Sequence, residues 1–125
     1  VASGFRESAL LMESALEKGN VHATAVQQEM HLAQAAALHY QSIAQQGRFI
    51  LQRNELAKEA NKEKQQKIRE EMKELLRQEL ECARSLYELQ RYDSRIGFEA
   101  TNHYFYTPAD LVEKVLNCAR LMESL

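Results

Sequence analysis

The scarcity of turn-forming residues limits the folds open to this chain more than any other feature. Its 125 residues include four Gly and one Pro, whereas a β-sandwich or an α/β fold needs many residues that form tight turns. Apolar residues make up 45% of the chain, which is enough to supply one hydrophobic core at this length. We therefore expect an all-α protein in which residues 1–125 form a single helical domain.

Apolar residues at helical spacing predict an antiparallel bundle of about four helices. The first helix is expected from about residue 5 to 18 and ends at Gly19, where a left-handed backbone is tolerated. Asn20 is a favourable N-cap for a long second helix. The inward stripe of this second helix is expected to consist of Val26, Met30, Ala33, Ala37, Tyr40, Ala44 and Leu51.

The third and fourth helices have start signals of unequal strength. The third is expected from about residue 61 to 91, and both Asn54 and Asn61 are suitable interruptions before it. The fourth has the clearest start, because residues 107–110 supply a threonine N-cap hydroxyl, a proline in the first turn and an acid three residues on. The expected apolar stripes are Ile68, Met72, Leu75, Leu76, Cys82, Leu86 and Leu89 in the third helix and Leu111, Val115, Cys118 and Met122 in the fourth.

The charge balance argues against nucleic acid and membrane surfaces as partners. Sixteen basic residues face 18 acidic ones, so the chain lacks the basic excess that neutralises phosphates or holds anionic lipid. The dense charges of residues 57–81 balance each other in sign and predict a solvated helical face with i,i+4 pairs. No apolar run approaches the length of about 20 residues that spans a bilayer. Because the chain begins at Val1 and not at Met, we expect a processed protein or a piece of a larger one, with its compartment left open.

The segment from residue 92 to 106 is the one part of the chain that looks like a site. It contains five of the nine aromatic residues, whereas a helix connection usually takes about 2–8 polar residues. One interpretation is a contact surface for a partner domain or a sugar-like ligand, because aromatic faces and bidentate donors suit both. The candidate contact residues are Asp93, Arg95, Glu99, Asn102, His103, Tyr104 and Tyr106.

The other interpretation of this segment is structural. Phe98, Tyr104 and Phe105 would plug the open end of the bundle while Asp93 pairs with Arg95. The pairing of Arg95 distinguishes the two interpretations, because an internally paired Arg95 favours the plug and an outward one favours the contact surface.

The residues that carry chemistry do not assemble a recognisable catalytic or metal site. Glu99 and His103 have an i,i+4 spacing, but they supply only two metal ligands. Asp93 and Glu99 are the only carboxylate pair in the segment suited to acid–base work. We therefore expect no metal, no cofactor and no autonomous catalysis; a small enzyme that uses Asp93, Glu99 and His103 stays a third alternative.

Two further patterns lie on the helices. His39, Ser42, Gln46 and Arg53 follow one another about a turn apart and predict either a solvent face or the rim of an interdomain contact. Cys82 and Cys118 are expected at the same height on neighbouring helices. They are either bridged or two buried thiols, and the thiols are the preferred interpretation because cysteine is commonly a small core residue.

The end of the chain resembles the helical C-terminal region of large bacterial glycoside-hydrolase-like proteins of the α-glucuronidase and hexosaminidase-like groups. The resemblance is carried by residues 93–108 (DSRIGFEATNHYFYTP) and 110–114 (DLVEK). In those groups helices pack against a catalytic barrel, so the resemblance implies an accessory domain with carbohydrate nearby, and no catalytic residue is carried over. The predicted function is therefore a helical accessory domain of a carbohydrate-active enzyme. The alternative is a free-standing interaction module that self-associates through the second and third helices.

Overall fold

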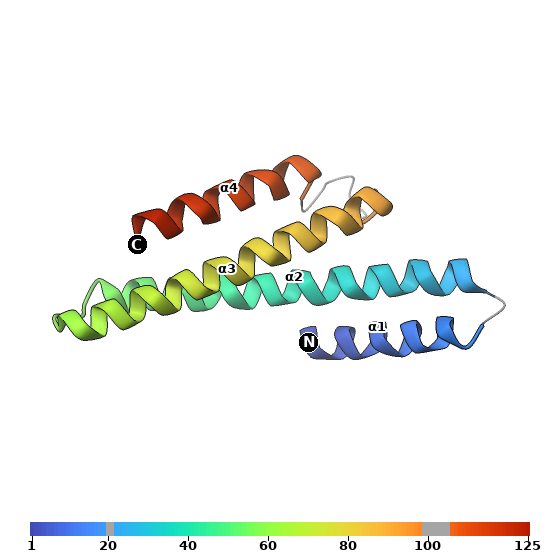
Figure 1. Cartoon of the computed structure of the whole chain (residues 1–125), viewed down its shortest axis with the longest axis horizontal. Helices are drawn as coiled ribbons and strands as arrows, with labels where there is room; N and C mark the ends of the chain where they lie inside the picture. Colours follow the sequence, from blue (N-terminus) through green and yellow to red (C-terminus); the bar gives the residue numbers. More distant parts are fainter. Residues whose placement is uncertain (20–21, 99–105) are drawn as a thin grey trace.

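The computed structural model describes residues 1–19, 22–98 and 106–125, and in these ranges it confirms an all-α helical bundle. Helices make up 84% of the described residues, and no strand occurs among them. Successive helices run antiparallel (Figure 1). They are α1 (Ala2–Glu17), α2 (Ala23–Leu56), α3 (Lys62–Tyr92) and α4 (Pro108–Ser124).

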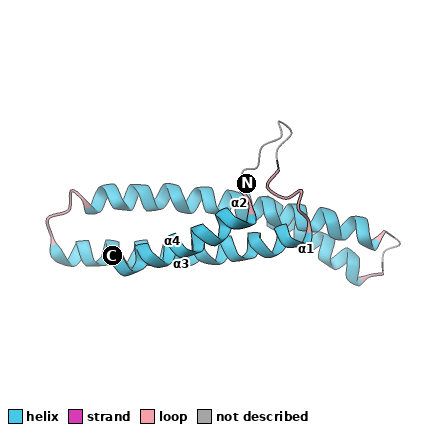
Figure 2. Cartoon of the chain, turned by 90° about the horizontal axis from the view of Figure 1, so that it is seen from above, coloured by secondary structure: helices cyan, strands magenta, loops and turns pink. Residues whose placement is uncertain are grey.

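The helices form an open succession around the long α2. Helix α1 lies along the first half of α2, α3 runs back along the second half and past the middle of α2, and α4 lies along α3 (Figures 1 and 2). The pairs in close backbone contact are α1 with α2, α2 with α3, and α3 with α4. A closed four-helix bundle would also pair the first helix with the last, and that pair is missing from the described helices. The bundle therefore leaves faces of α1, α2 and α4 uncovered.

The start of α2 differs from the prediction. Gly19 adopts a positive φ of 75°, as expected for the residue that ends α1. Helix α2 begins at Ala23 with His22 as its N-cap, and this cap makes no side-chain hydrogen bond to the helix. The predicted cap, Asn20, lies outside the described residues.

The starts of α3 and α4 follow the local signals in the sequence. The Asn61 side chain accepts hydrogen bonds from the backbone N–H groups of Glu63 and Lys64 at 2.9 and 3.1 Å, so Asn61 and not Asn54 marks the interruption. At α4, the Asp110 carboxylate accepts from the backbone N–H of Thr107 at 2.6 Å, and the Thr107 hydroxyl accepts from the backbone N–H of Asp110. The predicted capping box is therefore present.

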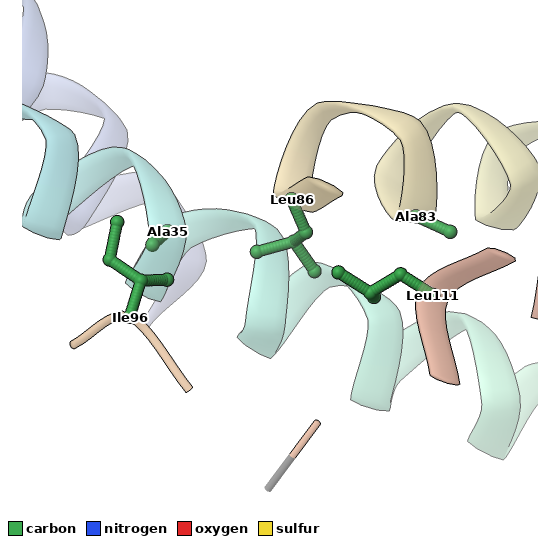
Figure 3. Packing of buried hydrophobic residues seen from close by; sticks show 5 residues of the cluster. All are labelled: Ala35, Ala83, Leu86, Ile96 and Leu111. Atoms are coloured by element: carbon green, nitrogen blue, oxygen red, sulfur yellow. The ribbon is translucent and has the colours of Figure 1, made fainter. Parts of the chain in front are cut away.

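A compact hydrophobic cluster joins α2, α3, α4 and the segment after α3. Leu86 of α3 and Leu111 of α4 point toward one another, and Ile96 lies beside Ala35 of α2 (Figure 3). The alanines at positions 35 and 83 are almost fully buried, and their small side chains let the helices approach closely. Ile96 thus brings the start of the aromatic segment into the core.

The predicted inward stripe of α2 is correct in its first half and wrong in its second. Ala33 and Ala37 are buried, but Tyr40 and Ala44 are exposed and Leu51 is 69% exposed. The reason is that α2 has different neighbours along its length, α1 over the first half and α3 from the end of α2 back to Ala35. Toward α3, helix α2 buries Ala35 together with the polar residues Ser42 and Gln45.

Candidate functional site

Asp93 and Arg95 form an ion pair at the end of α3. Asp93 is the C-cap, and its carboxylate accepts hydrogen bonds from the Arg95 backbone N–H at 3.0 Å and from Nε at 2.9 Å. These hydrogen bonds hold the pKa of Asp93 at about 2, below its ordinary value of 3.8. The Arg95 side chain is nevertheless 72% exposed. Arg95 is therefore internally paired and also accessible at the surface.

Gln90 ties both described ends of the aromatic segment to α3. Its side-chain N–H group donates to the backbone oxygens of Ile96 at 3.2 Å and Tyr106 at 2.9 Å. Tyr106 is half-buried and packs against the hydrophobic cluster. Gly97 has a φ of 89°, and a Cβ there would lie 2.8 Å from the Tyr106 oxygen. The two ends of the segment are thus packed tightly against each other.

The aromatic residues of the segment that the structure describes divide into two groups. Tyr106 packs inward, whereas Phe98 is 43% exposed. On the other side of the left-handed turn at Gly97, Ile96 is buried in the hydrophobic cluster. Tyr92 is exposed, and its ring meets that of His31 edge to face, with ring centroids 5.1 Å apart.

Four of the seven candidate contact residues lie outside the described residues. These are Glu99, Asn102, His103 and Tyr104. Because Glu99 is among them, its predicted pairings with His103 and with Asp93 also lie outside the described residues. In the described ranges no three His, Cys, Asp or Glu side chains gather to hold a metal. Asp93 is a weak proton donor at neutral pH, because Arg95 keeps its carboxylate ionised.

A buried polar network that sequence reasoning missed joins α2, α3 and α4. Glu79 is 5% exposed and accepts a hydrogen bond from the Ser42 hydroxyl at 2.6 Å. The Lys114 ammonium forms an ion pair with Glu79 and donates to the Ser42 oxygen at 2.9 Å. Ser42 is therefore buried, which contradicts a solvent face at this position. The sequence contains a sign that Glu79 is buried: it lies three residues from both Leu76 and Cys82, and so falls on the apolar stripe of α3.

Both cysteines are buried free thiols in the structure. Burial, followed by the charge of Glu79, raises the pKa of Cys82 to about 11. The pKa of Cys118 is also raised, and burial is again the main cause. Thiols with raised pKa values are weak nucleophiles at neutral pH, so we assign these cysteines to packing.

An apolar groove of about 410 Å³ opens beside this network, between α2, α3 and α4. The volume lies in the range of pockets that bind ligands or side chains. The apolar side chains that line it are Phe49, Ile50, Leu75, Leu76, Cys118 and Leu121, and the polar ones are Gln45, Gln46, Glu79, Asp110, Glu113, Lys114 and Asn117.

Large apolar side chains are also exposed on α1, α2 and α4 and at the last residue of α3. Where such side chains form a contiguous surface, they commonly mark a contact with another protein. They are Val1, Phe5, Leu10, Leu11, Leu32, Tyr40, Ile43, Ile50, Leu51, Tyr92, Phe98, Val112, Leu116 and Leu121.

Known proteins offer no guide to the role of these surfaces. No protein-family model, curated protein or solved structure matches this chain. In the described ranges, no helix is both long enough and apolar enough to cross a bilayer. The arrangement offers two surfaces for contact, the groove between α2, α3 and α4, and the end of α3 around the Asp93–Arg95 pair.

Proposed function

We propose that this chain is a helical accessory domain that packs against the catalytic domain of a carbohydrate-active enzyme. The observation that carries the proposal is the open arrangement of the helices, which leaves large apolar side chains of every helix in contact with water. Covering such side chains with a partner domain removes apolar area from water at about 25 cal/mol per Å². The carbohydrate part of the proposal rests on the resemblance of residues 93–108 and 110–114.

The end of α3 suits a contact surface for such a partner. Asp93 holds the Arg95 guanidinium through two of its nitrogens, so the side chain is already ordered before any partner arrives. Tyr92 and Phe98, on either side of this pair in the sequence, are both exposed. Arg and Tyr are enriched at the centres of many protein interfaces, so an ordered, exposed Arg95 near an exposed Tyr92 in the sequence suits a contact surface.

A free-standing module that self-associates is the second candidate. The observation that favours it is the exposure of Ile43, Ile50 and Leu51 on α2. Ile43 and Ile50 are seven residues apart, which places them on one face of the helix. Two copies packed along this face would cover the same apolar side chains without a catalytic partner.

The first test compares the isolated chain with the complete product of its gene. We expect the complete product to contain a further domain that hydrolyses a chromogenic glycoside and that co-purifies with this chain when the two are expressed as separate pieces. Sedimentation of the isolated chain should give a monomer. A complete product with no further domain, together with a dimeric chain, would favour the self-associating module.

The second test uses Arg95→Ala, with Arg84→Ala as the matched control. Arg84 is also an exposed arginine in a surface pair, with Glu81 at 3.0 Å. We expect Arg95→Ala to weaken association of the chain with the catalytic piece and Arg84→Ala to leave it unchanged. Equal association by both variants would remove the end of α3 from the contact surface.

A further inference from the structure

The groove between α2, α3 and α4 has the shape of a seat for one helix. Helix α4 lines it from Asp110 to Leu121, and these eleven steps of about 1.5 Å give a wall of about 16 Å. Helix α2 forms the opposite wall from Gln45 to Ile50, and α3 provides the floor. Figure 1 shows α4 lying along α3, on the side away from α1. The α4 wall is as long as about three turns of a helix, and the α2 wall, five steps from Gln45 to Ile50, is as long as about one and a half turns, so an amphipathic helix can lie along α4 with its middle between the two walls.

The walls of the groove expose apolar side chains that an occupant would cover. Ile50 on α2 is 47% exposed, and Leu121 on α4 is 44% exposed. The floor between them is formed by the buried side chains of Leu75 and Leu76. An occupant therefore needs its own apolar stripe, facing the floor and in contact with both walls.

The charges of the groove select a basic occupant. Its titratable lining consists of the carboxylates of Glu79, Asp110 and Glu113 and the single ammonium of Lys114. Lys114 is already bound to Glu79 and Ser42. Glu113 is exposed and forms no ion pair with the part of the chain that the structure describes. A basic side chain beside the apolar stripe of the occupant would pair with Glu113 at the edge of the groove.

Two buried acceptors at the groove lack a hydrogen-bond donor. They are Oε1 of Gln45 and Oε2 of Glu79, and neither meets a donor among the described residues. Both residues line the groove and are more than nine-tenths buried. Both oxygens are buried below the groove surface, so they do not select the occupant, and the basic side chain of an occupant meets Glu113 at the edge.

From these observations we propose that the groove binds an amphipathic helix of the partner domain, with an apolar stripe toward Leu75 and Leu76 and a basic side chain toward Glu113. This inference rests on the proposed function, because it names the segment of the partner that the accessory domain receives. The α1 helix of a second copy is a poorer occupant. It carries Glu7, Glu13 and Glu17 against one Arg6, and like charges across an interface oppose association.

The test uses two synthetic helical peptides of about four turns with the same leucine stripe, one flanked by lysines and the other by glutamates. Binding to the 125-residue chain is measured by fluorescence anisotropy. We expect the lysine peptide to bind at least about tenfold more tightly than the glutamate peptide. Glu113→Lys should abolish or reverse this preference. Glu123→Lys, a charge reversal on α4 outside the groove, should leave it unchanged.

A second pair of variants tests the apolar wall. Leu121→Asp should weaken binding of the lysine peptide at least about tenfold, whereas Leu116→Asp, also exposed on α4 but outside the groove, should leave it unchanged. Helix content and the urea midpoint of each variant establish that it folds. The inference is wrong if neither peptide binds, if the control variants weaken binding equally, or if Leu121→Asp alone dissociates a dimer of the chain.

The experiments distinguish a failure of the groove as docking site from a failure of the accessory role. If Leu121→Asp leaves association with the catalytic piece intact, the groove is not the docking site, but the accessory role stands. If the wild-type chain does not associate with any other part of its gene product, the accessory role fails, even when the lysine peptide binds in the groove.

Discussion

Two ion pairs of the chain, Glu79–Lys114 and Asp93–Arg95, differ chiefly in burial. Glu79 and Lys114 meet inside the bundle, where Ser42 adds a third partner. Asp93 and Arg95 meet at the surface, two residues apart in the sequence. The Glu79 side chain is buried and depends on Lys114, whose side chain is 30% exposed, whereas the Arg95 side chain of the second pair is 72% exposed and is solvated without its partner. An ion pair therefore joins three helices at Glu79 and Lys114, whereas at the end of α3 it orders only the surface side chain of Arg95.

The largest expected effect is that of Lys114→Met. This substitution leaves the Glu79 charge buried without its cation, and we expect a loss of about 3–5 kcal/mol in the free energy of unfolding. Urea denaturation followed by far-ultraviolet dichroism measures it. The control, Lys67→Met, removes an exposed i,i+4 pair with Glu71 and should cost less than about 1 kcal/mol. Equal losses of unfolding free energy in Lys114→Met and Lys67→Met would show that the buried pair contributes no more to stability than the exposed pair.

The double variant Glu79→Gln/Lys114→Met sharpens the same comparison. Because it removes both charges together, no uncompensated ion remains inside the bundle. We expect the double variant to be more stable than Lys114→Met alone, and a thermodynamic cycle of the four proteins gives the coupling between the residues. Strictly additive losses would mean that the two charges do not interact.

A smaller effect is expected for Gln90→Leu, which tests a buried but neutral polar contact. The substitution removes the donor that Ile96 and Tyr106 share, and we expect a loss of about 1–3 kcal/mol in the free energy of unfolding. Gln66→Leu is the control, because Gln66 is exposed and its amide donates only to Glu70 on the same helix. That control should stay within about 0.5 kcal/mol of the wild type.

The smallest effect on stability is expected for Arg95→Ala, because both members of its pair remain solvated after the change. Its urea midpoint should match that of Arg84→Ala. A clear loss of stability in Arg95→Ala alone would show that this pair holds the end of α3 in place, and the segment would then act as a plug.

The titration of Asp93 tests the surface pair without a loss of fold. Its pKa in the folded chain is about 2, below the ordinary value of 3.8, so the pair contributes its stabilisation above about pH 4 and loses it as the pH falls through about 2. A carboxyl resonance of Asp93 followed by NMR should have its midpoint near pH 2 in the wild type. In Arg95→Ala the midpoint should rise toward the ordinary value. A wild-type midpoint near pH 3.8 would contradict the pairing.

Much of the fold could be predicted because its signals are local, and the candidate site was predicted only in part. Asn61 and Thr107 cap their helices through hydrogen bonds to residues two or three positions ahead, so the sequence alone contains both partners of each bond. The pairing of Asp93 with Arg95 is equally local. By contrast, the role of Ile96 in the core was missed, because its neighbours come from helices far away in the sequence.

The helices, their order and most of their ends follow from local signals, because backbone hydrogen bonds, caps and apolar spacing act within a few residues. Tertiary structure alone decided which face of each helix is buried. Toward α3, helix α2 buries Ala35 but also the polar residues Ser42 and Gln45, and an apolar stripe cannot reveal a polar contact between helices. Glu79 meets Ser42 and Lys114 across 37 and 35 positions of sequence, and only the packing of three helices makes that buried charge tolerable.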